Sequence, residues 1–155
     1  MVPTAFWSRM KYVQSIHRLL YALGLGPVIG KIILLLTTIG RKSGKKRITP
    51  LQYEEVEGKF YIGSARGTHS DWFRNILADN HVEVHVSNRN FTGIAETVTD
   101  PLRIADFLEL RLRCHPYMVG LMMKSIHHLS SHPTRHQLEQ IAADEALVII
   151  TPLVA

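Results

Sequence analysis

The chain has 155 residues, 46% of them hydrophobic, and a mean hydropathy of +0.03, which excludes a disordered chain and a polytopic membrane protein and predicts a single domain over residues 1–155. The formal net charge of +5 and the isoelectric point near 9.6 predict an anionic partner, which charge alone leaves open between nucleic acid, lipid head groups and a phosphorylated small molecule. The single cysteine, Cys114, excludes an intramolecular disulfide and a cysteine-based zinc cage, so we expect a reducing compartment, by default the cytoplasm.

The first segment predicts an amphipathic helix. Apolar side chains recur at helical spacing from Phe6 to Leu23, with basic side chains between them, and Gly24 and Gly26 end the pattern. We expect this helix to pack against the domain, although such a helix can also contact a membrane surface peripherally. Basic residues interrupt it, so we expect no signal peptide, and the longest apolar run, 32–36, is too short to span a bilayer.

Residues 32–39 predict a buried strand because they are apolar and rich in β-branched side chains. The basic segment 40–46 is expected to be a loop. Residues 48–56 and 59–64 have extended patterns on either side of a tight turn at 57–58, where glutamate is followed by glycine. These two segments predict a first hairpin.

A short helix is expected next, with Ser70 as its N-terminal cap. Its apolar residues at helical spacing, expected on one face, are Trp72, Phe73, Ile76 and Leu77. Residues 82–86 then alternate between apolar and polar side chains, and residues 91–98 follow a turn at 88–90. The pattern predicts a second hairpin.

The last third of the chain predicts helices and one strand. Asp100 before Pro101 is a favourable helix start, because the carboxylate can cap the helix and proline suits its first position. Further helices are expected over 117–129 and after Pro133, and a strand over 146–151. Antiparallel hairpins, with a late strand available to close the sheet, predict an α+β fold built as a small barrel flanked by helices.

Four histidines crowd the region between the expected helices: His127, His128, His132 and His136. On one unbroken helix the three that are four residues apart would share a face and could bind a metal ion. Pro133 is expected to break that helix, and no carboxylate or cysteine joins the histidines. We therefore expect no metal site.

The segment 40–47 is the most strongly charged part of the chain. Five of its eight residues are Arg or Lys and two are Gly. Guanidinium forks, ammonium groups and closely approaching backbone N–H groups together suit a phosphate or carboxylate ligand. A Walker A loop needs four residues between its glycines and a hydroxyl residue after the lysine, whereas three residues separate Gly40 from Gly44 and Lys46 follows Lys45. The segment therefore predicts an anion site but not a nucleoside triphosphatase.

Three sequence blocks carry a resemblance to a known family. The first is Thr-Thr-Ile-Gly-Arg-Lys-Ser-Gly at 37–44, followed by Arg47 and by Thr-Pro-Leu at 49–51; the second is Gly-Ser-Ala-Arg-Gly at 63–67, and the third is Asp-Trp-Phe-Arg-Asn at 71–75. In this order and spacing they resemble the deazaflavin-dependent nitroreductase family. The resemblance implies a split antiparallel β-barrel of the FMN-binding split-barrel type and, as cofactor, the 8-hydroxy-5-deazaflavin coenzyme F420.

The resemblance also implies which residues hold the cofactor. Arg41, Lys42 and Arg47 would bind its phosphate, Ser43 would donate a hydrogen bond, and the lysines at 45–46 would attract its polyglutamate tail. The residues expected along or beside the deazaflavin ring are Ile48, Thr49, Pro50, Leu51, Gln52, Gly63, Ser64, Ala65, Arg66, Asp71, Trp72, Phe73, Arg74 and Asn75. The two aromatic residues in this set equally suit plain core packing.

The resemblance implies an F420-dependent oxidoreductase. A deazaflavin passes electrons in pairs as hydride, so the protein orients the cofactor and excludes water, and it needs no nucleophile. Family members place tyrosines before the last strand, where they line the substrate pocket and can donate a proton; Tyr117 is the counterpart here. The nearby Met118, Met122 and Met123 suit either an apolar pocket or a core, and we expect core packing. The acceptor stays open among nitro compounds, quinones and other activated double bonds.

Two other functions remain open. The same barrel and phosphate site would serve an FMN-binding split-barrel oxidoreductase. A non-catalytic module that binds anions or a membrane surface would use the same basic charge without redox chemistry. We expect no nucleic-acid partner, because exposed aromatic residues do not alternate with basic ones along neighbouring strands as in an RNA-binding sheet. The expected partner is a small-molecule acceptor, and a homodimer stays open.

Overall fold

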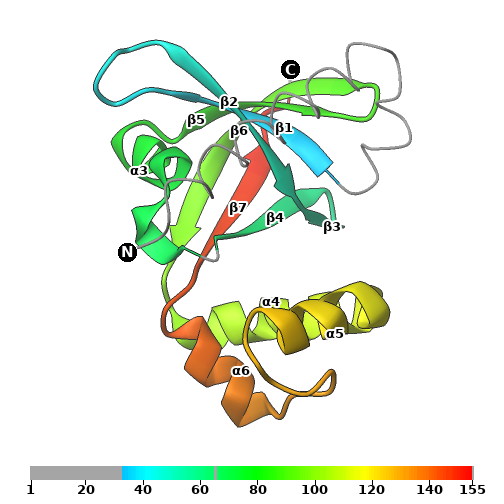
Figure 1. Ribbon diagram of the computed structural model, residues 1–155. Coiled ribbons are helices and arrows are strands. Elements are labelled where there is room, and N and C mark those ends of the chain that lie inside the picture. Colours follow the sequence, from blue (N-terminus) through cyan, green and yellow to red (C-terminus); the bar gives the residue numbers. More distant parts are fainter. Residues whose placement is uncertain (1–32, 65, 155) are drawn as a thin grey trace.

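The computed structural model describes residues 33–64 and 66–154, so the expected N-terminal helix and Ala65 lie outside the described residues. The described residues form one antiparallel sheet that curls into a half-barrel, with one short helix against the barrel and three helices gathered beside it (Figure 1). This confirms the expected α+β split barrel flanked by helices.

The elements follow the chain in an order that alternates hairpins and helices. They are β1 (Ile33–Ile39), β2 (Lys46–Gln52), β3 (Glu54–Val56), β4 (Lys59–Ser64), the 3-10 turn η1 (Gly67–His69), α3 (Asp71–Ala78), β5 (His81–Val86), β6 (Arg89–Val98), α4 (Pro101–Cys114), α5 (Pro116–Ser125), α6 (Arg135–Ala142) and β7 (Ala146–Pro152). The strand order in the sheet is β2-β1-β5-β6-β7-β4-β3.

Tyr53 is where the curled sheet closes. β2 pairs with β1 at one edge of the sheet, β3 pairs with β4 at the other, and Tyr53 alone separates β2 from β3 along the chain. Since one residue connects opposite edges, the sheet has to curl until those edges approach each other (Figure 1). The expectation of one extended segment over 48–56 is thereby corrected: the segment divides at Tyr53, and β2 already begins at Lys46.

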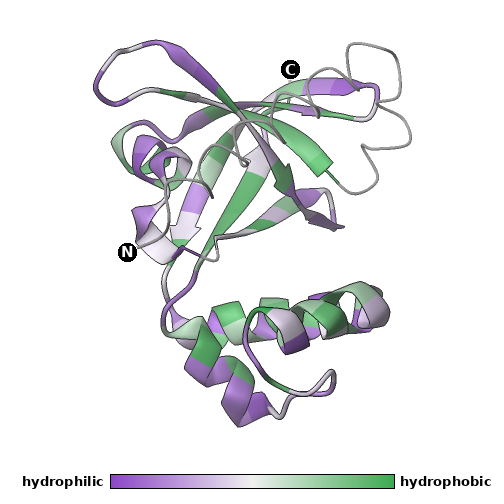
Figure 2. Cartoon of the chain, viewed as in Figure 1, coloured by the Kyte–Doolittle hydropathy of each residue, from purple (hydrophilic) through white to green (hydrophobic). Residues whose placement is uncertain are grey.

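The core has two parts that meet at β7. Inside the barrel, Leu34 and Phe60 pack with the inward side of β7, which includes Val148. Outside it, α4, α5 and α6 bury a second cluster against the other side of β7, where Leu147 and Ile149 point. Because β7 is apolar on both faces, it reads as a continuous hydrophobic run, and Figure 2 shows this strand in hydrophobic colours. This burial fixes the helices beside the barrel.

The helix boundaries confirm some expectations and correct others. Asp100 Oδ1 accepts a hydrogen bond from the Leu102 backbone N–H at 3.0 Å, so the expected cap of α4 is present. The helix expected over 117–129 ends at Ser125, and α6 begins after a capping box formed by Thr134 and Gln137. The spaced histidines at 128, 132 and 136 therefore do not share one helix.

α3 differs from its expected amphipathic face. Phe73 and Ile76 are fully buried in the barrel core and Trp72 is half-buried, but Leu77 is 60% exposed. Ser70 precedes the helix as expected, yet its side chain makes no capping hydrogen bond; its Oγ lies 3.0 Å from the Ser64 Oγ instead. This bond ties the end of β4 to the start of α3.

Glu145 is a buried carboxylate between α6 and β7. Its side chain is 10% exposed, and its Oε1 lies 3.5 Å from the His127 Nε2. Burial raises the pKa of Glu145 to about 7, with a smaller increase from Asp144 and an opposing decrease from Arg111. Burial therefore favours the protonated form of this carboxyl more in the folded protein than in the unfolded chain.

This burial predicts a pH-dependent stability. A carboxyl whose pKa rises on folding from 4.5 to about 7 stabilises the protein at low pH and loses that contribution as the pH rises through this interval. Relative to wild type, Glu145→Gln should gain up to about 3 kcal/mol of unfolding free energy between about pH 4.5 and pH 8. Urea unfolding at several pH values measures the difference. An identical pH dependence in the two proteins would contradict the assignment.

Candidate functional site

The basic loop between β1 and β2 is a compact turn closed by backbone hydrogen bonds. Gly40 N–H donates to the Lys45 carbonyl at 2.8 Å, and Gly44 N–H donates to the Gly40 carbonyl at 2.8 Å. Gly44 has a φ of +69°, and a Cβ at Gly40 would lie 2.7 Å from the Ser43 Oγ. Gly44 is therefore favoured by its left-handed backbone, whereas a Cβ at Gly40 would crowd the Ser43 hydroxyl and lie 3.2 Å from the Lys45 carbonyl oxygen.

α3 fixes this loop through a polar network around Asn75, which is 4% exposed. Asn75 Nδ2 donates to the Thr38 Oγ1 at 3.2 Å, and Asn75 Oδ1 accepts from the Arg41 backbone N–H at 3.2 Å and from Arg41 Nη1 at 2.9 Å. Arg41 Nη2 also pairs with Asp71 Oδ1 at 3.1 Å. The first and third sequence blocks thus contact each other directly, through residue pairs 30 and 34 positions apart.

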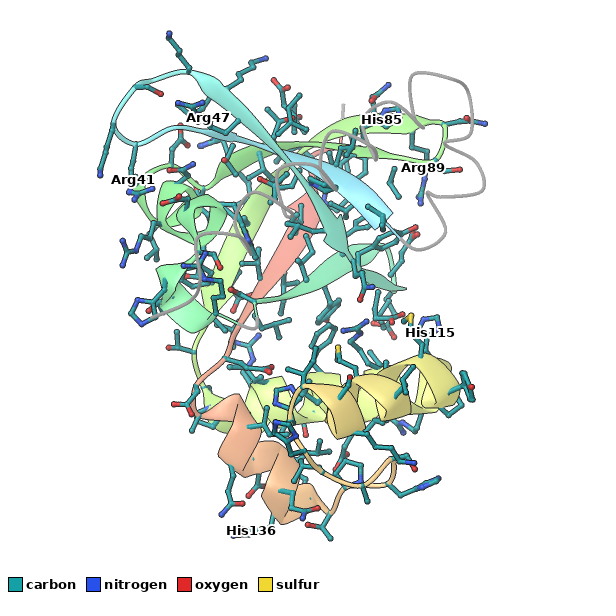
Figure 3. The ribbon with its side chains drawn as sticks, in the orientation of Figure 1. Arg41, Arg47, His85, Arg89, His115 and His136 are labelled. Atoms are coloured by element: carbon teal, nitrogen blue, oxygen red, sulfur yellow. The ribbon has the colours of Figure 1, made fainter. Side chains whose placement is uncertain are left out.

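Arg41 therefore has a positioning role that the sequence did not indicate. Its side chain is 23% exposed and binds α3, so the loop is held against the helix (Figure 3). Besides Gly44, the residues that the structure leaves exposed on the loop are Lys42, Ser43, Lys45, Lys46 and Arg47. Of these, Lys46 pairs with Glu83 at 2.7 Å. The phosphate-binding role expected of Arg41 stays a prediction.

The residues expected along the cofactor ring lie on two strands. On β2, Ile48 is 40% exposed, the residues at 49–51 are half-buried and Gln52 is exposed. Pro50 fits an edge strand, because proline cannot donate a ladder hydrogen bond. On β4, Gly63 is exposed, and a Cβ there would lie 3.2 Å from the Phe107 ring.

The remaining expected site residues divide between interior and surface. Ser64 is 3% exposed and donates to the Gly67 carbonyl at 2.7 Å. Phe73 is fully buried, which is the core role that the sequence left open for it. Arg66, Asp71 and Arg74 are exposed, and of these Asp71 contacts the loop through Arg41. Burial gives Ser64 and Phe73 a packing role, and the cofactor contacts expected of them stay predictions.

A cleft of about 270 Å³ lies at the other end of β2 from the basic loop. It is lined by Gln52, Arg111, Met118, Val119, Leu121, Met122, Ser125 and Ile126. Most of these come from α5, and the polar groups Gln52 and Arg111 come from β2 and α4. Met123 packs in the core as expected, whereas Met118 and Met122 line the cleft.

Arg111 is the cleft residue that sequence reasoning missed. It is 9% exposed, its Nη2 donates to the Gln52 Oε1 at 3.0 Å, and its Nε lies 3.6 Å from the Glu54 Oε1. Glu54 Oε1 also lies 2.9 Å from the His115 Nε2, and His115 faces the barrel in Figure 3. One sequence pattern could have indicated this residue: Arg111 is a basic residue at a position of α4 where helical spacing predicts an apolar one, three residues after Leu108.

Tyr117, the expected catalytic residue, lies near the start of α5. Its side chain is 87% exposed, and the cleft lining begins at the next residue, Met118. Its catalytic role stays a prediction. Within residues 33–64 and 66–154, no group of three or more His, Cys, Asp or Glu residues is arranged to hold a metal ion, and no helix is long and apolar enough to cross a membrane.

A curled antiparallel barrel of this topology belongs to the split-barrel class of folds, and the exposed cations of its β1–β2 loop suit a phosphorylated ligand. The family model described as F420H(2)-dependent quinone reductase matches residues 12–120, and the chain belongs to this family. It is an F420-dependent oxidoreductase, and coenzyme F420 is its cofactor. This confirms the resemblance to the deazaflavin-dependent nitroreductases.

Solved structures with this fold are distant in sequence. A protein described as F420 reductase is 19% identical over 79% of this chain and 87% of its own, with a TM-score of 0.52. An F420-H2-dependent reductase, FDR-A, is 24% identical over 77% and 94%, with a TM-score of 0.51. A protein described as a domain-swapped dimer is 21% identical over 96% and 99%, with a TM-score of 0.54. These similarities support the split-barrel fold.

The Asn75 network predicts a stability loss. Asn75→Ala removes three hydrogen bonds and leaves the Arg41 backbone N–H and the Thr38 hydroxyl without this partner, which should cost about 2–3 kcal/mol of unfolding free energy. Urea unfolding measures the cost. Arg74→Ala, on the exposed side of the same helix, serves as control and should change stability by no more than about 0.5 kcal/mol. Equal losses in both variants would contradict the network's role.

Proposed function

We propose that the chain binds coenzyme F420 along β2 and uses it to reduce a small quinone-like acceptor held in the cleft. The proposal rests on one observation: a basic loop and a mostly apolar cleft lie at opposite ends of the same strand, β2. The exposed basic loop precedes Lys46 at one end of β2, and the mostly apolar cleft begins at Gln52 at its other end. A molecule with an anionic end and a planar reactive end suits this arrangement.

The chemistry of the loop fits a phosphate. Two of the loop's basic side chains form ion pairs, Arg41 with α3 and Lys46 with β5. In the contacts described above, Lys42, Lys45 and Arg47 form no ion pair to α3 or β5, and Ser43 adds a hydroxyl group. Arginine can bind two phosphate oxygens at once, and the lysines add mobile positive charge for further carboxylates. Arg41 would then orient the loop through Asp71 and Asn75 and contribute positive charge behind it.

The length of β2 also fits the proposal. Its six residue steps from Lys46 to Gln52 span about 20 Å at the usual rise of a strand. An extended cofactor that has its phosphate at the loop would bring its ring toward the Gln52 end. The half-buried residues at 49–51 and the exposed backbone of Gly63 would then line the ring.

Bound F420 supplies a hydride when reduced, so the residues of the chain bind, orient and exclude water. The loop anchors the anionic end, β2 aligns the ring, and α5 covers the acceptor with apolar side chains. The family description favours a quinone as acceptor. Nitro compounds and other activated double bonds are the alternatives within the same chemistry.

Three further features of the chain stay predictions. A single domain over 1–155 and a peripheral membrane contact both involve residues before 33, which lie outside the described part. A homodimer is supported by the similarity to a protein described as a domain-swapped dimer.

The cofactor site predicts the effect of removing two exposed loop charges. Lys42→Ala with Arg47→Ala should weaken F420 binding about a hundredfold, because two charge-assisted contacts to phosphate are lost. Titration of F420 fluorescence measures the affinity, and turnover of 2-methyl-1,4-naphthoquinone with reduced F420 measures the function.

The matched control removes two exposed charges elsewhere, Lys59→Ala with Arg103→Ala, and should bind F420 as tightly as wild type. FMN, titrated in parallel, should bind more weakly than F420. Equal affinities of the loop variant and the control would exclude the proposed anchor, and tighter binding of FMN would favour the flavin alternative.

A further inference from the structure

We propose that Arg111 binds the acceptor's carbonyl oxygen in the cleft and stabilises the negative charge that develops on it during reduction. This inference rests on the proposed function and names a residue and a substrate feature for it. Arg111 lies on α4, outside all three sequence blocks of the family resemblance. The acceptor it would select is a planar, apolar ring system that carries a carbonyl oxygen at its edge.

The walls of the cleft suit such a ring system. Four of the residues that line it are large and apolar: Met118, Leu121, Met122 and Ile126. The volume of about 270 Å³ exceeds the ~150 Å³ of an apolar cavity known to admit benzene, so a two-ring molecule has room. Methionine side chains are flexible and polarizable, and they adapt to flat ligands of different outline.

Arg111 supplies the polar end of the cleft. Its Nη2 donates to Gln52, but its buried Nε has no hydrogen-bond acceptor among the residues that the structure describes. A guanidinium carries five N–H donors, and buried donors without acceptors are costly. Nε is buried and faces Glu54, so an acceptor oxygen in the cleft would bind the Nη end of the guanidinium, whose one described hydrogen bond runs from Nη2 to Gln52.

The carboxylate of Glu54 holds the Arg111 guanidinium in place through an ion pair, without accepting a hydrogen bond from it. Glu54 Oε1 lies 3.6 Å from Arg111 Nε, too far for a hydrogen bond, and the same oxygen lies 2.9 Å from His115. Glu54 is 9% exposed, so its charge is little screened by water. The ion pair therefore positions Arg111 beside the cleft and leaves its hydrogen-bonding capacity available.

The chemical step needs such a group. Reduced F420, when bound, would supply a hydride to one carbonyl oxygen of the quinone; both carbonyl π bonds are then lost, the ring becomes aromatic, and the electron pair ends on the other oxygen as a phenolate. A proton from solvent then completes the hydroquinone. A guanidinium within hydrogen-bond distance of that oxygen lowers the energy of the anion as it forms, which is the role of an oxyanion-binding donor.

Variants of Arg111 test the inference in two independent assays. Arg111→Met should lower kcat/KM for 2-methyl-1,4-naphthoquinone by about 10²–10³, the usual loss when one oxyanion donor is removed. It should also weaken binding of the oxidised quinone to the cofactor-free protein about tenfold, measured by calorimetry. Arg113→Met, an exposed neighbour on the same helix, is the matched control and should leave both values unchanged.

A second variant keeps the test valid if Arg111→Met fails to fold. Leu121→Trp changes a 58% exposed residue of the cleft wall, so folding should be retained while the ring has less room. Its KM for the quinone should rise at least fivefold, with an unchanged affinity for F420.

The outcomes separate the two proposals. If F420 binds and the quinone is reduced, but Arg111→Met and Leu121→Trp both retain the wild-type kcat/KM and quinone affinity, the inference is wrong and the proposed function stands. If wild type fails to bind F420 yet binds the quinone through Arg111, the proposed function is wrong and the cleft assignment stands. Faster reduction of an activated alkene without a carbonyl oxygen than of the quinone would also overturn the choice of substrate.

Discussion

The connection of β2 to β3 through Tyr53 is the constraint on which the rest of the structure depends. The two strands occupy opposite edges of the sheet, so a single residue can join them only if the sheet curls until its edges meet. The curl turns one face of the barrel strands inward to form the first core. It also leaves β2 at one edge of the sheet, with the basic loop at its start and the cleft of α4 and α5 at its end.

Both ends of β2 are held by side chains from distant parts of the chain. At the loop end, Asn75 connects Thr38 with Arg41, so α3 determines how the exposed cations are presented. At the cleft end, Arg111 reaches from α4 to Gln52, and β7 anchors the helices through Leu147 and Ile149. The barrel thus supplies the frame that positions the loop and the cleft.

Much of this could be predicted from local patterns in the sequence. Alternation predicted the strands, Asp100 predicted the start of α4, and the glycine-containing basic segment predicted the loop. The sequence could not predict partners 30 to 60 positions away: Arg41 contacts Asp71 and Asn75, and Arg111 contacts Gln52 across 59 positions. Exposure of Leu77 and the end of α5 at Ser125 likewise follow from tertiary packing, which periodicity does not report.

A crystal structure of the protein with oxidised F420 and 2-methyl-1,4-naphthoquinone tests the central claim most directly. The account predicts the phosphate within hydrogen-bond distance of Lys42 and Arg47, the ring along β2, and a quinone oxygen on Arg111 in the cleft. A phosphate bound away from residues 40–47, or a ring that leaves β2 before Gln52, would contradict it.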